Sequence, residues 1–193
     1  MSLKKWPIRI ALSIAVLVPP CIGTAWALLQ NGQADIAGDA PGASITVTSS
    51  NFKNGQAIPA RFTCDGANVS PDIQWSALPT GTKSIAIVMD DSDTPMSFTH
   101  WLAYDIPAGT HDIPEGASTP SMRLGHAAEG ANNFGNIGYG GPCPPSGTHH
   151  YHFRVYALDV DLALPSGQSK EQLANAVKGH VLAKGAISGV FSH

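Results

Sequence analysis

The stretch GPCPPSGTHHYHFRVYALD, residues 141–159, joins a proline-rich loop directly to a run with the alternation of a β-strand. Proline fixes the backbone φ angle and has no N–H to donate, so Pro142, Pro144 and Pro145 stiffen the loop and keep it out of a sheet. Residues 150–159 then alternate with period two, which predicts a strand. A stiff loop beside polar groups at a strand end is typical of a small binding pocket, and we look for one here.

The two faces of this strand differ in polarity. One face becomes apolar after its first members and carries His149, Tyr151, Phe153, Val155 and Ala157. The other face is more polar and carries His150, His152, Arg154 and Tyr156. His149 and Tyr151 are therefore expected where the apolar face meets the loop. A metal site is not expected, because only His150 and His152 share a face, and two ligands fall short of the three or four that zinc uses.

Residues 1–27 have the features of a secretory signal peptide. A basic start is followed by an apolar run over 10–18, by Pro19-Pro20 and by the motif Ala25-Trp26-Ala27, which predicts cleavage after Ala27. The alternative is an uncleaved membrane anchor, but the apolar run is shorter than the ~20 residues that a spanning helix needs. A lipoprotein site at Cys21 is disfavoured, because the preceding Val-Pro-Pro lacks small residues.

The rest of the chain divides into a leader and one domain. Residues 28–43 are rich in Gly, Ala and Asp and are expected to be a flexible leader, and residues 44–193 suit a single domain with its own core. Loss of residues 1–27 lowers the 11 basic residues to 8, against 14 acidic ones, so the mature net charge is about −6. This balance argues against a nucleic-acid partner, whose phosphates require a basic patch.

Cleavage would leave two cysteines, Cys64 and Cys143. An even number of cysteines in an exported chain favours a disulfide, and two buried free thiols are the alternative. A bridge would tie the proline-rich loop to the loop that starts near Asp65.

The remaining pattern predicts a mainly β fold, an antiparallel β-sandwich with a C-terminal helix packed on it. Short strand-like runs occur at 45–49, 61–63, 73–75, 84–90, 99–106 and 150–159. Residues 108–147 read as a long ordered loop region. Ser169 and Gln172 form a capping box at the start of the helix, whose apolar face carries Leu173, Val177 and Val181 and whose end is expected at Gly185.

Two further polar features precede the opening stretch. In THWLAYDI, residues 99–106, strict alternation places His100 on one face with Leu102, Tyr104 and Ile106. The acidic turn DDSDTP, residues 90–95, needs cationic partners, and histidines are expected to supply them. A carboxylate that accepts a hydrogen bond from an imidazole raises the ring's pKa. Considered alone, the acidic segment could be an ordinary turn, and each histidine could be an ordinary core or surface residue.

Three blocks together carry a family resemblance: CDGANVSPDIQW at 64–75, DDSDTP with HW at 90–101, and GYGGPCPPSGTHHYHFRVYALD at 138–159. They resemble the phosphatidylethanolamine-binding protein family, and more closely its bacterial branch, which is labelled Raf kinase inhibitor-like. The resemblance runs from about Ile45 to the C-terminus and includes GHVLAKG, which we place in the expected helix.

The resemblance implies a β-sandwich with a small cavity for anionic groups. The family's D-P-D-x-P segment falls on residues 91–95, its pocket histidine on His100, and its G-x-H-[RH]-Y segment on residues 147–151. The implied binding residues are Asp91, Asp93, Pro95, His100, Tyr139, Gly141, Pro144, Pro145, His149 and Tyr151. Two positions depart from the family pattern: Ser92 replaces a proline, and Asn133 stands where bacterial relatives usually have an acid.

These observations favour a non-catalytic binding protein, periplasmic or secreted if the source is bacterial. Its expected ligand is phosphate, a phosphorylated head group or a carboxylate, with no cofactor and no stable membrane span after cleavage. Modulation of an unknown protein partner and homodimerisation are further expectations. The alternative is a hydrolase that uses an Asp–His pair in the same pocket, although the chain lacks a G-x-S-x-G elbow and a phosphate-binding loop with lysine.

Overall fold

The computed structural model of the chain describes residues 35–37, 42–119, 124 and 127–193. The predicted signal peptide at 1–27 lies outside the described residues, and so does most of the predicted leader at 28–43.

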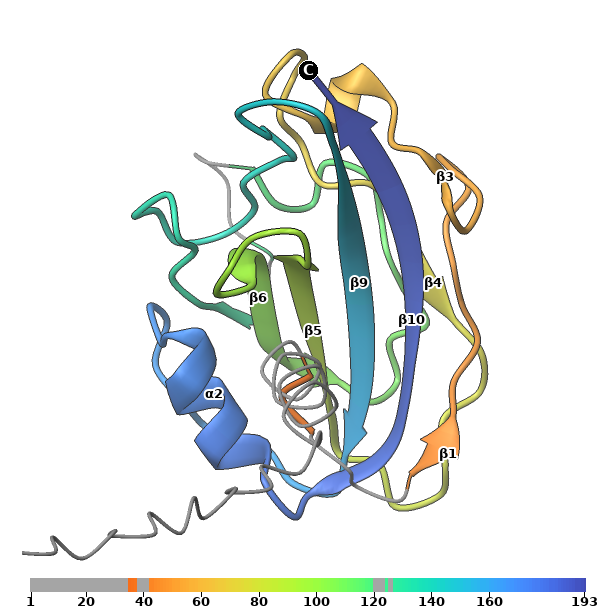
Figure 1. Cartoon of the computed structure of the whole chain (residues 1–193). Helices are drawn as coiled ribbons and strands as arrows, with labels where there is room; N and C mark the ends of the chain where they lie inside the picture. The colour runs from red at the N-terminus through yellow and green to blue at the C-terminus, as the bar shows by residue number, and fades with distance from the viewer. Residues whose placement is uncertain (1–34, 38–41, 120–123, 125–126) are drawn as a thin grey trace, which may run out of the picture.

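A large mixed sheet forms the centre of the molecule (Figure 1). Its strand order is β1-β10-β9-β5-β6-β8, with β3 also paired to β10. The long strands β5, β6, β9 and β10 pair with one another in antiparallel fashion, whereas β1 and β3 run parallel to β10. The strands are β1 Ala43–Ser44, β3 Gln56–Ala57, β5 Ser84–Asp91, β6 Phe98–Pro107, β8 Ala128–Glu129, β9 Thr148–Leu158 and β10 Val181–Ser192.

A smaller sheet of three short strands packs on one face of the large sheet. It has the order β2-β4-β7, with β2 Val47–Thr48, β4 Ile73–Trp75 and β7 Asp112–Ile113. The main core lies between the two sheets and includes Ile73, Trp75, Ile87, Met89 and Phe153. The predicted antiparallel β-sandwich is thereby confirmed.

Helix α2, Lys170–Val177, covers the opposite face of the large sheet, where Leu173 and Val177 are buried in a second apolar cluster. The predicted capping box is present, because the Ser169 side chain accepts from the Gln172 N–H while the Gln172 side chain accepts from the Ser169 N–H.

The predicted helix end at Gly185 is wrong. The helix stops at Val177, and Gly179 adopts a φ of 84°, which favours glycine. Val181 and Gly185 belong instead to β10, which pairs with β9 along its whole length. A Cβ atom at Gly185 would lie 1.8 Å from the Ile45 carbonyl oxygen, so the glycine serves close packing between strands. The GHVLAKG block therefore follows the helix.

Two other predicted strands differ from the structure. Residues 61–63 do not form a strand, because Ala60–Phe62 is a single 3₁₀ turn, η1, that follows Pro59. The run at 45–49 contributes only the two residues of β2. The predicted strands at 73–75, 84–90, 99–106 and 150–159 are confirmed as β4, β5, β6 and β9 with small shifts at their ends.

Strict alternation failed in β6. Leu102 and Tyr104 pack in the cluster under α2, whereas Trp101 and Ile106 belong to the core between the sheets. The pairing of β6 with β5 shifts register twice, once on either side of residues 101–103. An extra residue in one strand changes the face of the residues beyond it, so the predicted common face of His100, Leu102, Tyr104 and Ile106 is wrong.

Within the described residues, no helix is long and apolar enough to cross a membrane.

Candidate functional site

Three neighbouring strands bring four of the predicted residues together. Asp91 ends β5, and its Cα is paired with that of Tyr151 near the start of β9. His149 precedes Tyr151 on β9, and His100 lies near the start of β6. We call Asp91, His100, His149 and Tyr151 the Asp91–His149 cluster. The antiparallel pairing explains it, because the end of β5 must lie beside the starts of β6 and β9.

A short hydrogen bond joins His149 to Asp91. The Nδ1 atom of His149 lies 2.6 Å from Oδ2 of Asp91, and the two side chains are 15% and 4% exposed. A carboxylate oxygen accepts, so Nδ1 carries the proton. The remaining ring nitrogen, Nε2, can accept a hydrogen bond when the ring is neutral and donate one when it is protonated.

His100 is held by the backbone of the proline-rich loop. Its Nδ1 donates to the Gly140 carbonyl at 2.7 Å, and the Gly140 N–H donates to the His100 carbonyl at 3.0 Å. Burial lowers the pKa of His100 by more than the Gly140 carbonyl and Asp91 raise it. The nearby Asp91 carboxylate does raise the pKa of His100, as expected, but the loss of contact with water lowers it by more, so the net pKa falls.

Tyr151 carries the unusual polar atom of the cluster. Its side chain is fully buried, and its ring meets that of His100 edge-on at a centroid distance of 5.2 Å. Among the described residues, its hydroxyl oxygen is the one buried side-chain nitrogen or oxygen without a hydrogen-bond partner. Burial raises the pKa of Tyr151, and the nearby Asp91 carboxylate raises it further, while a backbone group of Cys143 lowers it; neither neighbour meets the hydroxyl with hydrogen-bond geometry. The hydroxyl therefore keeps its proton and remains a donor.

Asp93 borders the cluster, because its N–H donates to Oδ1 of Asp91 at 2.9 Å, but its own carboxylate is directed to His150. Oδ2 of Asp93 accepts from the backbone N–H of His150 at 2.6 Å and from its ring at 2.9 Å. Burial raises the pKa of Asp93, but the hydrogen bonds and charge of His150 outweigh this effect and lower it overall. Pro95 is exposed at the end of the turn.

The predicted loop residues mostly support the site from outside. The buried Tyr139 hydroxyl donates to the Phe62 carbonyl at 2.7 Å. Gly141 lies so close to the same segment that a Cβ atom there would meet the Phe62 carbonyl oxygen at 2.4 Å. Pro144 is buried and Pro145 is exposed. These residues fix the loop against the segment that follows η1.

The structure contains the predicted disulfide between Cys64 and Cys143, with a Cα–Cα distance of 5.4 Å. The Cys64 N–H also donates to the Pro142 carbonyl at 3.0 Å. The proline-rich loop is therefore tied to the segment after η1 by a covalent bond and a hydrogen bond, and the alternative of two buried free thiols does not hold.

The two departures from the family pattern both make local hydrogen bonds. The Ser92 N–H donates to the His150 carbonyl at 3.1 Å, a contact that a proline could not make. The Asn133 side chain accepts from the Thr99 N–H at 2.7 Å, and its own N–H donates to the Thr99 carbonyl at 2.9 Å. Ser92 thus adds a contact to β9, and Asn133 anchors its loop to β6.

Two aromatic rings beside His100 were missed by the sequence analysis. Phe98 and Phe134 lie with ring centroids 5.1 Å and 5.3 Å from the His100 ring. Phe134 is 45% exposed and comes from the Gly- and Asn-rich loop region, where no periodicity could have indicated its direction.

Asp90 has cationic partners that the sequence analysis did not identify. Its fully buried carboxylate pairs with Arg154 of β9 and, at 2.9 Å, with Lys170 of α2. The prediction that histidines supply the partners of the acidic turn therefore fits Asp91 and Asp93 but is wrong for Asp90. Adjacent residues of a strand point to opposite faces, and Asp90 points toward the helix.

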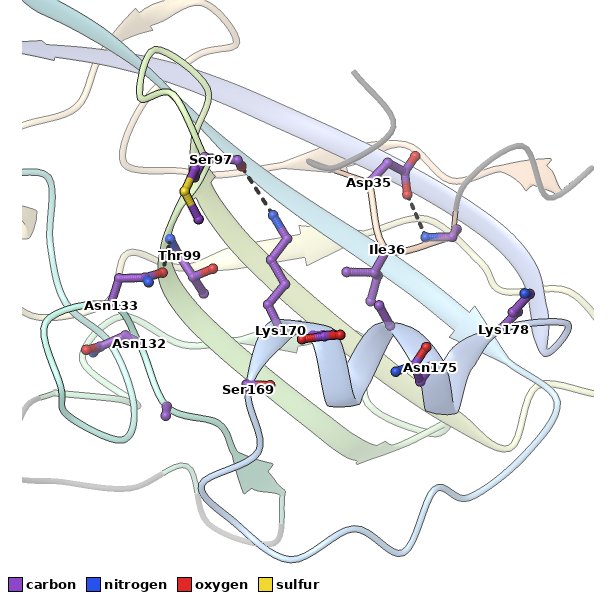
Figure 2. Close-up of a pocket in the computed structure, with 15 residues that line it drawn as sticks. Asp35, Ile36, Ser97, Thr99, Asn132, Asn133, Ser169, Lys170, Asn175 and Lys178 are labelled. Atoms are coloured by element: carbon purple, nitrogen blue, oxygen red, sulfur yellow. Dashed lines mark hydrogen bonds between the residues drawn. The ribbon is translucent and has the colours of Figure 1, made fainter. Parts of the chain in front are cut away.

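A cavity of about 780 Å³ lies away from the Asp91–His149 cluster, beside α2 (Figure 2). Lys170 points across it, with its ammonium group 3.2 Å from the Ser97 hydroxyl. The two partly buried charged groups in its wall are already paired, Lys170 with Asp90 and Asp35 with Lys184. The remaining charged residues of its wall, Glu171 and Lys178, are exposed. Among the described residues, the cavity therefore offers no buried polar side-chain group that lacks a partner, whereas the Asp91–His149 cluster offers the Tyr151 hydroxyl.

Comparison with known proteins places the chain in a family. The family model described as phosphatidylethanolamine-binding protein matches residues 48–192. The chain belongs to the phosphatidylethanolamine-binding protein family. A curated relative from Aquifex aeolicus, named UPF0098 protein, is 45% identical over 157 residues, which cover 79% of this chain and 91% of the relative. The crystal structure of a putative phosphatidylethanolamine-binding protein homologue from Chlamydia trachomatis matches with a TM-score of 0.71 and 34% identity, covering 78% of this chain and 98% of that one.

A third relative bears on location. The putative lipoprotein LppC of Mycobacterium tuberculosis is 38% identical over 161 residues, which cover 81% of this chain and 77% of the relative. Lipoproteins are exported, and disulfides persist in oxidising compartments outside the cytosol. The name of this relative and the Cys64–Cys143 bridge both fit an exported protein.

Proposed function

We propose that this member of the phosphatidylethanolamine-binding protein family is an exported, non-catalytic binding protein whose Asp91–His149 cluster takes a small anionic group. The observation that carries the proposal is the buried Tyr151 hydroxyl without a partner. A buried donor without an acceptor costs about 1–3 kcal/mol, and a ligand oxygen placed there would remove that cost.

The charge of the cluster selects among anions. The Asp91 carboxylate is 4% exposed and is matched by one imidazole, that of His149. With His149 protonated the pair is neutral, and Nε2 can donate to a ligand beside the Tyr151 hydroxyl. A second full negative charge on the ligand would meet the carboxylate without compensation. The cluster therefore favours a monoanion, such as a phosphodiester of a phosphorylated head group or a carboxylate, over a phosphate dianion.

The test is calorimetric titration of the protein with dimethyl phosphate, inorganic phosphate and acetate. Loss of a charged hydrogen bond in His149→Ala should cost about 1.5–3 kcal/mol, a loss of affinity of about 10- to 150-fold. His180→Ala is the matched control, because His180 also pairs with an aspartate, Asp159, but is exposed and belongs to a different part of the chain. Equal affinities of wild type and His149→Ala would refute the proposal.

A hydrolase is the second candidate, because the short Asp91–His149 contact of 2.6 Å has the geometry of a general base and its orienting carboxylate. Its test is turnover of p-nitrophenyl phosphate and p-nitrophenyl acetate. The binding proposal predicts that wild type and His149→Ala hydrolyse these substrates at equal rates. A rate that falls in His149→Ala but not in His180→Ala would favour the enzyme.

A further inference from the structure

The disulfide lies in a cluster of further metal-ligating atoms. His193, at the end of β10, reaches back to the bridge, and its Nε2 atom lies 3.8 Å from Sγ of Cys64. Sγ of Cys64, Sγ of Cys143 and a ring nitrogen of His193 all lie within 4.8 Å of one another. Figure 1 shows the C-terminus beside the 3₁₀ turn η1, which ends two residues before Cys64.

A fourth candidate ligand, Asp65, lies next to His193 but outside the group of three mutually close atoms. Oδ1 of Asp65 lies 2.9 Å from Nε2 of His193, and the side chains of His193 and Asp65 are 35% and 50% exposed. Two sulfurs, one imidazole nitrogen and one carboxylate oxygen are the atoms that zinc binds in tetrahedral sites. In the described part of the chain, no other group of three or more His, Cys, Asp or Glu residues has ligand atoms this close together.

We propose that Cys64, Cys143, His193 and Asp65 form a zinc site that is closed by the disulfide and opened by reduction. A dithiol reductant supplies two electrons. One of its thiolates attacks a sulfur of the bridge and breaks the S–S bond, and its second thiol then displaces the mixed disulfide. The reductant leaves as a cyclic disulfide, and Cys64 and Cys143 become thiols. Zn²⁺ then displaces both thiol protons and bonds to the two thiolates.

His193 is already close to the sulfurs, whereas the Asp65 carboxylate has to move from His193 toward the metal to join. Bonds of about 2.3 Å to sulfur and about 2.0–2.2 Å to nitrogen and oxygen put tetrahedral ligand atoms about 3.3–3.8 Å apart. The Cys64–His193 distance of 3.8 Å already has this size. To bind the metal, the His193 ring turns so that Nε2 faces the metal instead of Asp65. The ring is then a neutral imidazole with its proton on Nδ1, and the Asp65 carboxylate becomes the fourth ligand.

The surrounding backbone keeps the two cysteines in place when the bridge opens. The hydrogen bond from Cys64 to the Pro142 carbonyl and the close fit of Gly141 on Phe62 do not depend on the S–S bond. Zinc would therefore tie the proline-rich loop to the segment after η1 under reducing conditions, as the disulfide does under oxidising ones.

The experiment uses the protein with Cys21→Ser, so that no other thiol can bind metal. It is reduced with dithiothreitol, freed of the reductant under anaerobic conditions and titrated with Co²⁺ and then Zn²⁺. The reduced protein should bind one equivalent of Co²⁺ with a thiolate charge-transfer band and the visible bands of tetrahedral Co²⁺, which Zn²⁺ then removes. The oxidised protein should show neither band.

Variants separate this site from two thiols acting alone. His193→Ala and Asp65→Ala should each weaken Zn²⁺ binding by at least about tenfold. His180→Ala removes an equally exposed histidine paired with Asp159 and should leave the affinity unchanged. The proposal is overturned if the reduced protein shows no tetrahedral Co²⁺ bands, if His193→Ala binds as wild type does, or if near-ultraviolet circular dichroism shows that the reduced chain unfolds and Zn²⁺ does not refold it.

Discussion

Asp90 and Asp91 are neighbours in β5, yet their carboxylates serve opposite faces of the large sheet. Asp91 pairs with His149 beside the proline-rich loop, whereas Asp90 pairs with Arg154 and Lys170 beneath α2. The alternation of a strand assigns one acid to the candidate site and the other to the attachment of the helix. Substitutions of Asp90 and of residues in the Asp91–His149 cluster are therefore expected to have different effects.

Asp90→Asn should lower the free energy of unfolding by about 3–5 kcal/mol, because the fully buried carboxylate is the counter-charge of Arg154 and Lys170. Urea unfolding measures the change. Asp159→Asn, which removes an exposed partner of His180, should change it by at most about 1 kcal/mol. If the two variants are equally stable, Asp90 does not hold the helix to the sheet.

Tyr151→Phe should affect stability and binding in opposite directions. The variant removes a buried hydroxyl that has no partner in the unliganded protein, so the free energy of unfolding should stay the same or rise by up to about 1–3 kcal/mol. Affinity for dimethyl phosphate should fall, since the donor is lost. A variant that is less stable and binds as wild type does would show that the hydroxyl has a structural partner instead.

Acid should destabilise the protein partly through His100. Its pKa lies below the ordinary 6.5 in the folded state, so below pH 6.5 the unfolded chain binds more protons than the folded one. The free energy of unfolding should therefore decrease as the pH falls from 6.5 to about 5. His100→Asn, whose amide can still donate to the Gly140 carbonyl, should show a shallower decrease in urea unfolding across that range. An unchanged slope would contradict the assignment.

Loss of the disulfide should cost stability by an amount that grows with the logarithm of the length of the loop that it closes. The bridge spans 79 residues, for which loop entropy gives about 4.5 kcal/mol. The variant Cys64→Ser/Cys143→Ser should unfold at lower urea by this amount, with Cys21→Ser as its matched background. Titration of the denatured, unreduced Cys21→Ser protein should find no free thiol, and two free thiols would show that the bridge does not form.

The sequence could predict the parts of the fold that follow a regular period. Tyr151 and Phe153 alternate with His150 and His152, and the structure keeps them on separate faces. Alternation failed in β6, because register shifts there depend on the pairing with β5 and leave no mark in the β6 sequence. The strand β10 was missed because Val181 continues the helical spacing of Leu173 and Val177, although the backbone leaves the helix at the extended Lys178 and turns at Gly179.

The candidate site could be predicted only in part. The faces of β9 and the family resemblance indicated Asp91, His100, His149 and Tyr151. The lowered pKa of His100 and the unpaired Tyr151 hydroxyl depend on burial and on the Gly140 carbonyl, which are tertiary contacts. The same holds for the contact of His193 with Asp65, which joins residues 128 positions apart.

The most direct test of the binding proposal is a crystal structure of the protein with dimethyl phosphate, a monoanionic phosphodiester. The account predicts one phosphate oxygen within about 2.5–3.0 Å of the Tyr151 hydroxyl and another within hydrogen-bond distance of Nε2 of His149. A phosphate bound in the cavity beside Lys170, with the Tyr151 hydroxyl still unpaired, would contradict it.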